Sequence, residues 1–107
     1  MDFSDITLTN YKVANRPKLS PEIFRPIFDA IKNFKALGVY HGDLSSSNIL
    51  LSPSEAPTRA FLIDFGRAGV REHGMSEEDW TSLYEFYSDE MGFGAALNWS
   101  GIPWPSL

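Results

Sequence analysis

The fold of this chain is decided by residues 41–66, which read HGDLSSSNILLSPSEAPTRAFLIDFG. Two short apolar runs, at residues 49–51 and 60–63, flank a polar segment that contains two prolines. Short runs of strand-forming residues separated by turn residues are typical of a β-hairpin. We therefore expect a hairpin over about residues 49–63.

Polar side chains lie next to both ends of this hairpin. Asp43 and Asn48 precede its first strand, and Asp64 follows its second. Because the start of the first strand and the end of the second meet in a hairpin, these three side chains are predicted to converge. Carboxylate and amide oxygens suit Mg²⁺, which keeps waters or phosphate oxygens as further ligands. The alternative is that Asp43 is a turn residue, Asn48 a cap and Asp64 a surface acid.

The same stretch resembles the catalytic loop and metal motif of the protein-kinase-like superfamily, H-R-D-L-x-x-x-N followed by D-F-G. The pattern stands here as HGDL at residues 41–44, Asn48, and DFG at residues 64–66. The resemblance implies that Asp43 is the catalytic base, which accepts the proton of the attacking hydroxyl. It also implies that Asn48 and Asp64 hold Mg²⁺ against the phosphates of ATP.

The resemblance assigns supporting roles as well. It implies that His41 is structural and that Gly66 permits an unusual backbone turn. Gly42 replaces the arginine that meets an activation-loop phosphate in protein kinases, so control by that route is not expected. Ser45 stands where protein kinases often carry a lysine. The His-Gly-Asp form is similar to aminoglycoside and choline phosphotransferases, and to the atypical small kinase of the tRNA-threonylcarbamoylation complex.

The features of a kinase N-terminal lobe are not found ahead of this motif. Residues 1–40 contain no G-x-G-x-x-G, and Lys12 and Lys18 lack the strand context of the kinase lysine. We therefore expect a protein-kinase-like C-terminal lobe without the N-terminal lobe. Its fold class would be α+β: mainly α, with a small β-hairpin that carries the site.

A helix is expected on the N-terminal side of the catalytic loop, over about residues 20–37. Ser20 and Pro21 form a helix-start signal, and apolar residues then recur at spacings of three and four. Gly38 suits the left-handed end of a helix. Pro26 removes one backbone hydrogen bond, so the helix could instead begin there.

A second helix is expected over about residues 77–91, with Gly92 at its end. Ser76 and Asp79 have the spacing of a capping box. Asp79 could alternatively be the helix acid that supports the catalytic loop in kinases. Residues 94–107, which include Trp99 and Trp104, are expected to be irregular.

Composition limits the class of protein. The chain has 107 residues, a net charge of −5 and no cysteine, and its length fits one small domain. The resemblance implies that residues 1–107 form a single partial protein-kinase-like domain. Disulfides and zinc-thiolate sites are excluded, and an acidic chain argues against nucleic-acid binding. There is no apolar run long enough to span a membrane and no secretory signal, so an intracellular, soluble protein of the cytoplasm or nucleus is expected.

The expected function is that of a kinase-like phosphotransferase. It would transfer phosphate from ATP, with Mg²⁺, to a hydroxyl of a protein or small molecule. We expect this chain by itself to be incomplete or weakly active, and a protein partner to supply or replace the N-terminal lobe. The alternative is a catalytically inactive, kinase-derived binding module whose exposed aromatic side chains contact a partner.

Overall fold

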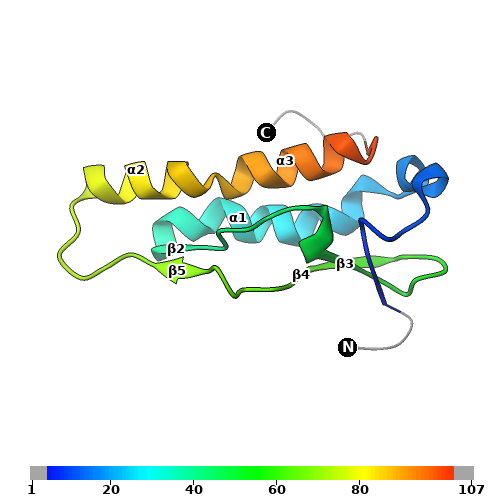
Figure 1. Cartoon of the computed structure of the whole chain (residues 1–107), viewed down its shortest axis with the longest axis horizontal. Coiled ribbons are helices and arrows are strands. Elements are labelled where there is room, and N and C mark those ends of the chain that lie inside the picture. The colour runs from blue at the N-terminus through cyan, green and yellow to red at the C-terminus, as the bar shows by residue number, and fades with distance from the viewer. Residues whose placement is uncertain (1–4, 103–107) are drawn as a thin grey trace.

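The computed structural model describes residues 5–102 and shows a flat arrangement built along one central helix. This central helix is α1 (Arg25–Leu37), while α2 (Glu77–Tyr87) and α3 (Asp89–Trp99) follow later in the chain. In Figure 1, α2 and α3 run end to end along one side of α1, and the strands lie along the other side. Helices and small antiparallel sheets together confirm the α+β class.

The strands form two small sheets. The first has the order β1 (Ile6–Thr7), β3 (Ile49–Ser52) and β4 (Arg59–Leu62), and both of its pairings are antiparallel. The second pairs β2 (Val39–Tyr40) with β5 (Gly69–Val70). The predicted hairpin is therefore present as β3 and β4. In the sequence, β2 comes just before the catalytic loop and β5 comes just after the DFG motif.

Short 3₁₀ helices, η1 (Val13–Lys18) and η2 (Pro21–Phe24), precede α1. The prediction of one helix from residue 20 is wrong in this respect, because residues 21–24 form the separate η2 and α1 begins at Arg25. Pro26 then lies in the first turn of α1, where the backbone N–H that it lacks would have no partner within the helix. The alternative start near Pro26 is confirmed.

One face of α1 forms the centre of the core. Ile27, Phe28 and Ile31 are buried, and Phe28 stacks on Phe93 of α3 with ring centroids 6.2 Å apart. Other core residues come from all parts of the described chain: Leu8, Leu19, Phe24, Ile49, Leu51, Ala60, Ala96, Leu97 and Ile102. The predicted apolar stripe is thus core over most of its length. Its last member, Leu37, is 70% exposed because the helix ends at the next residue.

Left-handed residues terminate α1 and α2, and only the first of the two was predicted. Gly38 ends α1 with φ 75°, as its position indicated. Ser88, with φ 49°, ends α2 and also precedes α3. The predicted single helix over residues 77–91 is therefore wrong, and so is the prediction of an irregular segment from Gly94 onward, because α3 continues to Trp99.

Gly92 does not terminate a helix but lies inside α3. A Cβ added there would come within 2.5 Å of the carbonyl oxygen of Leu44, so this glycine lets α3 pack directly against the catalytic-loop backbone. The predicted position of Trp104 falls outside the described residues. None of the helices within residues 5–102 has both the length and the apolar character that crossing a bilayer requires.

Candidate active site at the end of the β3–β4 hairpin

The hairpin ends where two of the predicted site residues begin. Asn48 directly precedes β3 and closes the short helix η3 (Ser46–Asn48), and its carbonyl oxygen accepts a hydrogen bond of 2.9 Å from the N–H of Ile63. Asp64 is the next residue after Ile63. The antiparallel pairing of β3 with β4 therefore brings the backbones on either side of the site together, as the hairpin predicted.

Asn48 also contacts the third predicted residue. Its side-chain Nδ2 donates to the backbone carbonyl of Asp43 at 2.6 Å and lies 3.3 Å from the carboxylate Oδ2 of the same residue. Asn48 is buried and Asp43 is exposed. Because Nδ2 is used in these bonds, the amide oxygen of Asn48 is the atom left to act as a ligand.

Asp64 is exposed and has an unusual backbone conformation. Its φ is 60°, and its Oδ1 accepts a bond of 3.3 Å from the N–H of Gly66. The left-handed residue of this motif is therefore Asp64, and Gly66 is not among the described residues with positive φ. The expectation that Gly66 makes the unusual turn is wrong. A positive φ in a non-glycine residue is costly and is retained when the surroundings impose it.

His41 connects the hairpin to the catalytic loop from a fully buried position. Its Nε2 lies 2.8 Å from the carbonyl oxygen of Ile63, and its Nδ1 lies 3.2 Å from the N–H of Asp43. A carbonyl can only accept and an N–H can only donate, so both bonds together require a neutral imidazole with its hydrogen on Nε2. Phe65 packs against this ring, with centroids 4.8 Å apart in an edge contact. The structural role expected for His41 is in keeping with these contacts.

Asp89, the first residue of α3, is the acid that holds the backbone of the catalytic loop. Its Oδ2 accepts from the N–H of His41 at 2.7 Å, and its Oδ1 accepts from the N–H of Gly42 at 3.1 Å. Asp89 is 1% exposed. Asp79 lies in the first turn of α2, where its backbone N–H donates to the capping hydroxyl of Ser76 at 3.0 Å.

Sequence reasoning missed Asp89 because it was placed within a continuous helix. A helix start after Ser88 was the available signal, since Asp89 and Glu90 are acids of the kind found in a first helical turn. The bond from the N–H of His41 to Asp89 joins positions 48 residues apart. Nothing in local sequence periodicity indicates a bond over that separation.

Gly42 packs against the segment that follows the metal motif. Its φ is 87°, and a Cβ at this position would lie 2.4 Å from the carbonyl oxygen of Arg67. Gly69 has a similar role, because a Cβ there would lie 2.2 Å from the hydroxyl of Tyr40. Glycine at residue 42 therefore lets the backbone of Arg67 approach the catalytic loop, and glycine at residue 69 leaves room for the ring of Tyr40.

Gly42→Ala is expected to destabilise the protein more than Gly74→Ala. Both glycines have φ 87°, but a Cβ at Gly74 would have no atom within 4 Å, whereas a Cβ at Gly42 would face backbone. Gly74→Ala should cost about 1–2 kcal/mol of unfolding free energy from its left-handed conformation alone. Gly42→Ala should cost a further ~1–3 kcal/mol, because backbone must move to relieve the contact. Urea unfolding measures both, and equal losses would contradict the close packing of residue 42 on Arg67.

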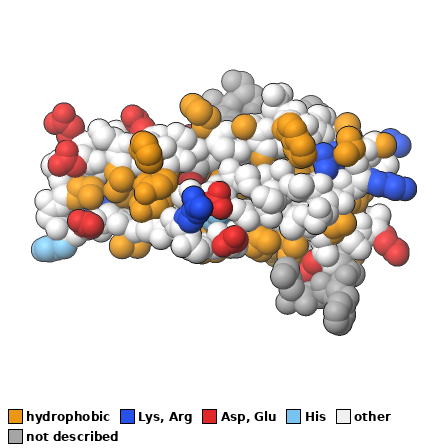
Figure 2. Space-filling view, viewed as in Figure 1, with side chains coloured by type: hydrophobic (Ala, Val, Ile, Leu, Met, Phe, Trp, Pro, Cys, Tyr) orange, Lys and Arg blue, Asp and Glu red, His pale blue; other side chains and the backbone are white. Residues whose placement is uncertain are grey.

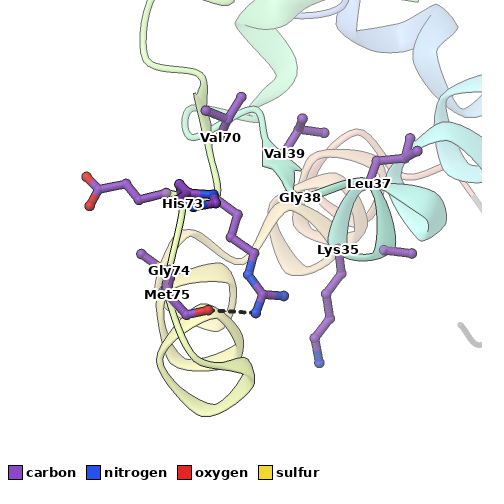
Figure 3. A pocket seen from close by; sticks show the side chains of 11 residues that line it. Lys35, Leu37, Gly38, Val39, Val70, His73, Gly74 and Met75 are labelled. Atoms are coloured by element: carbon purple, nitrogen blue, oxygen red, sulfur yellow. Dashed lines mark hydrogen bonds between the residues drawn. The ribbon is translucent and has the colours of Figure 1, made fainter.

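A recess of about 450 Å³ at the C-terminal end of α1 lies apart from these residues. Figure 3 shows Lys35, Gly38, Val39, Val70, His73 and Met75 around it. The guanidinium of Arg71 donates to the carbonyl of Met75 and to Glu77, both at 2.7 Å, and it lowers the pKa of the Glu77 carboxyl. These bonds attach the segment after β5 to the start of α2. None of the three predicted site residues lines this recess.

The donor set at the hairpin end is compatible with a hard divalent cation. It offers the carboxylates of Asp43 and Asp64 and the amide oxygen of Asn48, which are oxygen donors of the kind Mg²⁺ takes. Over residues 5–102, no group of three or more His, Cys, Asp or Glu side chains is placed to hold a metal ion. A magnesium ion at this site would therefore need oxygens from phosphate or water to complete its shell.

Known kinases are similar to this chain in sequence. The sequence profile that matches residues 2–101 is that of the lipopolysaccharide kinase (Kdo/WaaP) family. Homeodomain-interacting protein kinase 1 of Caenorhabditis elegans is 32% identical over 87 residues, which cover 80% of this chain and 10% of that protein. The chain thus spans a tenth of the length of this curated relative. No solved structure matches the chain.

These similarities confirm the resemblance to the protein-kinase-like superfamily. The matched region includes the hairpin, the catalytic loop and all residues that support it. Kinase-like phosphotransferases of this kind use ATP. The chain belongs to the lipopolysaccharide kinase (Kdo/WaaP) family.

Proposed function

We propose that the hairpin end is the catalytic centre of an ATP-dependent phosphotransferase that transfers the γ-phosphate to a hydroxyl. The observation that supports this most directly is the link from Asp43 through Asn48 to Ile63, the residue before Asp64. It joins the proposed base and the proposed metal ligands in one hydrogen-bonded unit. Phosphoryl transfer depends on this kind of positioning, because the chemistry asks little else of the protein.

Each residue has a defined task in this proposal. Asp43, whose carboxylate is exposed, accepts the proton of the attacking hydroxyl. Asn48 and Asp64 bind Mg²⁺ through oxygen, and the bound ion offsets the charge of the ATP phosphates. The Nδ1 of His41 accepts a hydrogen bond from the backbone N–H of Asp43, and this bond orients the base. The acceptor is a hydroxyl of a protein or a small molecule.

An apolar groove of about 340 Å³ lies next to the metal motif. We propose that a second folded unit binds in this groove. Ile27 and Phe34 of α1 line one side, and Phe61 and Phe65 line the other. Phe65 also contacts His41, so a unit seated in the groove would touch the support of the catalytic loop. This unit would supply the glycine-rich loop and lysine, from a longer polypeptide or from a protein partner. Without it, we expect weak nucleotide binding and little turnover.

Calorimetric titration with ATP tests the proposed metal site. We expect heat of binding with Mg²⁺ present and none after chelation with EDTA. Asp64→Asn should weaken magnesium-dependent binding by about tenfold or more, or ~1.4 kcal/mol, because an amide replaces an anionic ligand. Asp29→Asn, the same change on the exposed surface of α1, should leave binding unaltered. Affinity that is equal with and without magnesium, or equal in Asp64→Asn, would overturn the proposed site.

A further inference from the structure

The charge of this chain is divided between its two ends. Arg71 is the last Lys or Arg, and residues 72–107 contain seven Asp or Glu. This acidic part includes all of α2 and α3. In Figure 2, Lys and Arg lie mainly at the right-hand end of the molecule, whereas Asp and Glu lie at the left-hand end and also near the middle and the right of this face. The helices therefore present a surface of one sign.

An apolar groove of about 520 Å³ lies at the junction of α2 and α3. Tyr84 and Met91 line it together with Glu85, Ser88 and Glu90. Met91 is 73% exposed, so a large flexible apolar side chain faces solvent there. Phe86, on the last turn of α2, is 80% exposed. The groove therefore combines apolar surface from Tyr84 and Met91 with two exposed acids, Glu85 and Glu90, which we call its acidic rim.

Tyr84 fixes the floor of this groove. It is 7% exposed, and its hydroxyl donates to the carbonyl of Ile31 at 3.2 Å. Burial, helped by the charges of Glu90 and Asp89, raises the pKa of Tyr84 to about 12. The carboxylate of Glu90 thus acts on the floor residue itself, which places negative charge beside the apolar surface.

The chemistry of the groove selects one kind of occupant. Anionic lipid surfaces and nucleic acids carry phosphate, which the acidic rim repels. Lys and Arg side chains would instead pair with Glu85 and Glu90. The lining residues come from two helices, whose backbone groups are bonded internally, so an added β-strand has no edge to pair with. A helix with an apolar stripe flanked by basic residues fits both the floor and the rim.

We propose that the groove between α2 and α3, lined by Tyr84, Glu85, Ser88, Glu90 and Met91, is a docking site for a basic amphipathic helix of another polypeptide. One apolar residue of that helix would insert beside Met91. Its basic residues one turn away on either side would reach Glu85 and Glu90. This site is separate from the hairpin end, so its existence does not depend on phosphoryl transfer.

Fluorescence anisotropy with designed peptides tests the docking site on the full chain. The probe is a labelled helical peptide of Leu and Lys with the apolar residues at helical spacing, and the matched control replaces Lys by Glu. We expect saturable binding of the Lys peptide that weakens with salt, and no binding of the Glu peptide. The double variant Glu85→Lys, Glu90→Lys should bind the Lys peptide at least tenfold more weakly.

Two further variants separate docking from general charge attraction. Met91→Glu adds an acid, so it would strengthen a purely electrostatic interaction but should weaken insertion of an apolar side chain about tenfold. Glu55→Lys, in the β3–β4 turn, makes the same charge change as one of the two rim substitutions, but away from the groove. It should have no more than a minor effect on peptide affinity. Thermal melts check that each variant is folded, and Glu90→Gln serves as a milder second test of the rim.

Several results would overturn the proposal. Equal binding by the wild type and the double variant would show that Glu85 and Glu90 do not take part in binding. Stronger binding by Met91→Glu would show that no apolar side chain inserts beside Met91. A loss of peptide affinity in Glu55→Lys as large as in the double variant would show that binding depends only on the net charge of the chain. Dimerisation of the chain in sedimentation experiments that the double variant abolishes would assign the groove to a second copy of this protein, and binding of anionic vesicles with the same variant profile would assign it to a membrane.

Discussion

Asp43→Asn is expected to lower the rate of γ-phosphate transfer by about 10²–10⁴-fold, because the amide cannot accept the proton of the attacking hydroxyl. The side chain is nearly unchanged in shape, and the backbone carbonyl of Asp43 can still accept from Asn48 Nδ2. Binding of magnesium-ATP should therefore change little. Transfer is measured with ATP labelled in the γ-phosphate, by following label that reaches water or protein hydroxyls.

Asp79→Asn is the matched control for this experiment. It makes the same chemical change on an exposed acid in the first turn of α2, whose backbone N–H, which the substitution keeps, donates to the Ser76 cap. We expect its transfer rate to equal that of the wild type. If Asp43→Asn retains the full rate, Asp43 is not the base. If the wild type binds nucleotide but transfers no phosphate even with a second folded unit added, the chain is a binding module.

Asp89→Asn is expected to lower the free energy of unfolding by about 2–4 kcal/mol, because it removes one of two bonds to buried backbone N–H groups. The carboxylate uses one oxygen for His41 and the other for Gly42. An amide has only one oxygen, so its NH₂ would face one of these N–H groups without an acceptor. For a domain whose total stability is about 5–15 kcal/mol, this is a large share.

The measurement combines urea unfolding with hydrogen exchange of the two amides. The amide N–H of His41 or Gly42 should exchange faster in Asp89→Asn than in the wild type, since it loses its acceptor. Glu90→Gln, one residue later on the same first turn of α3, should change neither quantity appreciably. Unaltered stability and exchange in Asp89→Asn would show that α3 does not hold the catalytic loop.

Supporting bonds of this kind explain why the site can be both exposed and ordered. Asp43 and Asp64 lie at the surface, while His41, Asn48 and Asp89 behind them are buried and hydrogen-bonded. Hydrogen bonds from these buried groups to the backbone of the loop favour one arrangement of that backbone. The exposed acids are therefore presented in a fixed place without being buried themselves.

The amino-acid sequence by itself determined the features that depend on neighbouring residues. The hairpin β3–β4 follows from two apolar runs around a turn, and the end of α1 follows from Gly38, which adopts φ 75° without the strain that a side chain would bring. The cap of α2 follows from the Ser76 hydroxyl, which reaches the N–H of Asp79 three residues later. The association of Asn48 with the end of the hairpin followed in the same way.

Only the tertiary structure decided the features that join distant parts of the chain. Ser88 interrupts the apparent single helix, and Asp89 bonds to a loop 48 residues earlier. Gly92 looked like a helix end, but it is inside α3 because Leu44 approaches too closely for a side chain. Local propensity sets the energy of a residue's own conformation, whereas these choices depend on which surfaces meet after folding. That is why the local sequence pattern located the hairpin, but not the buried acid that supports the catalytic loop beside it.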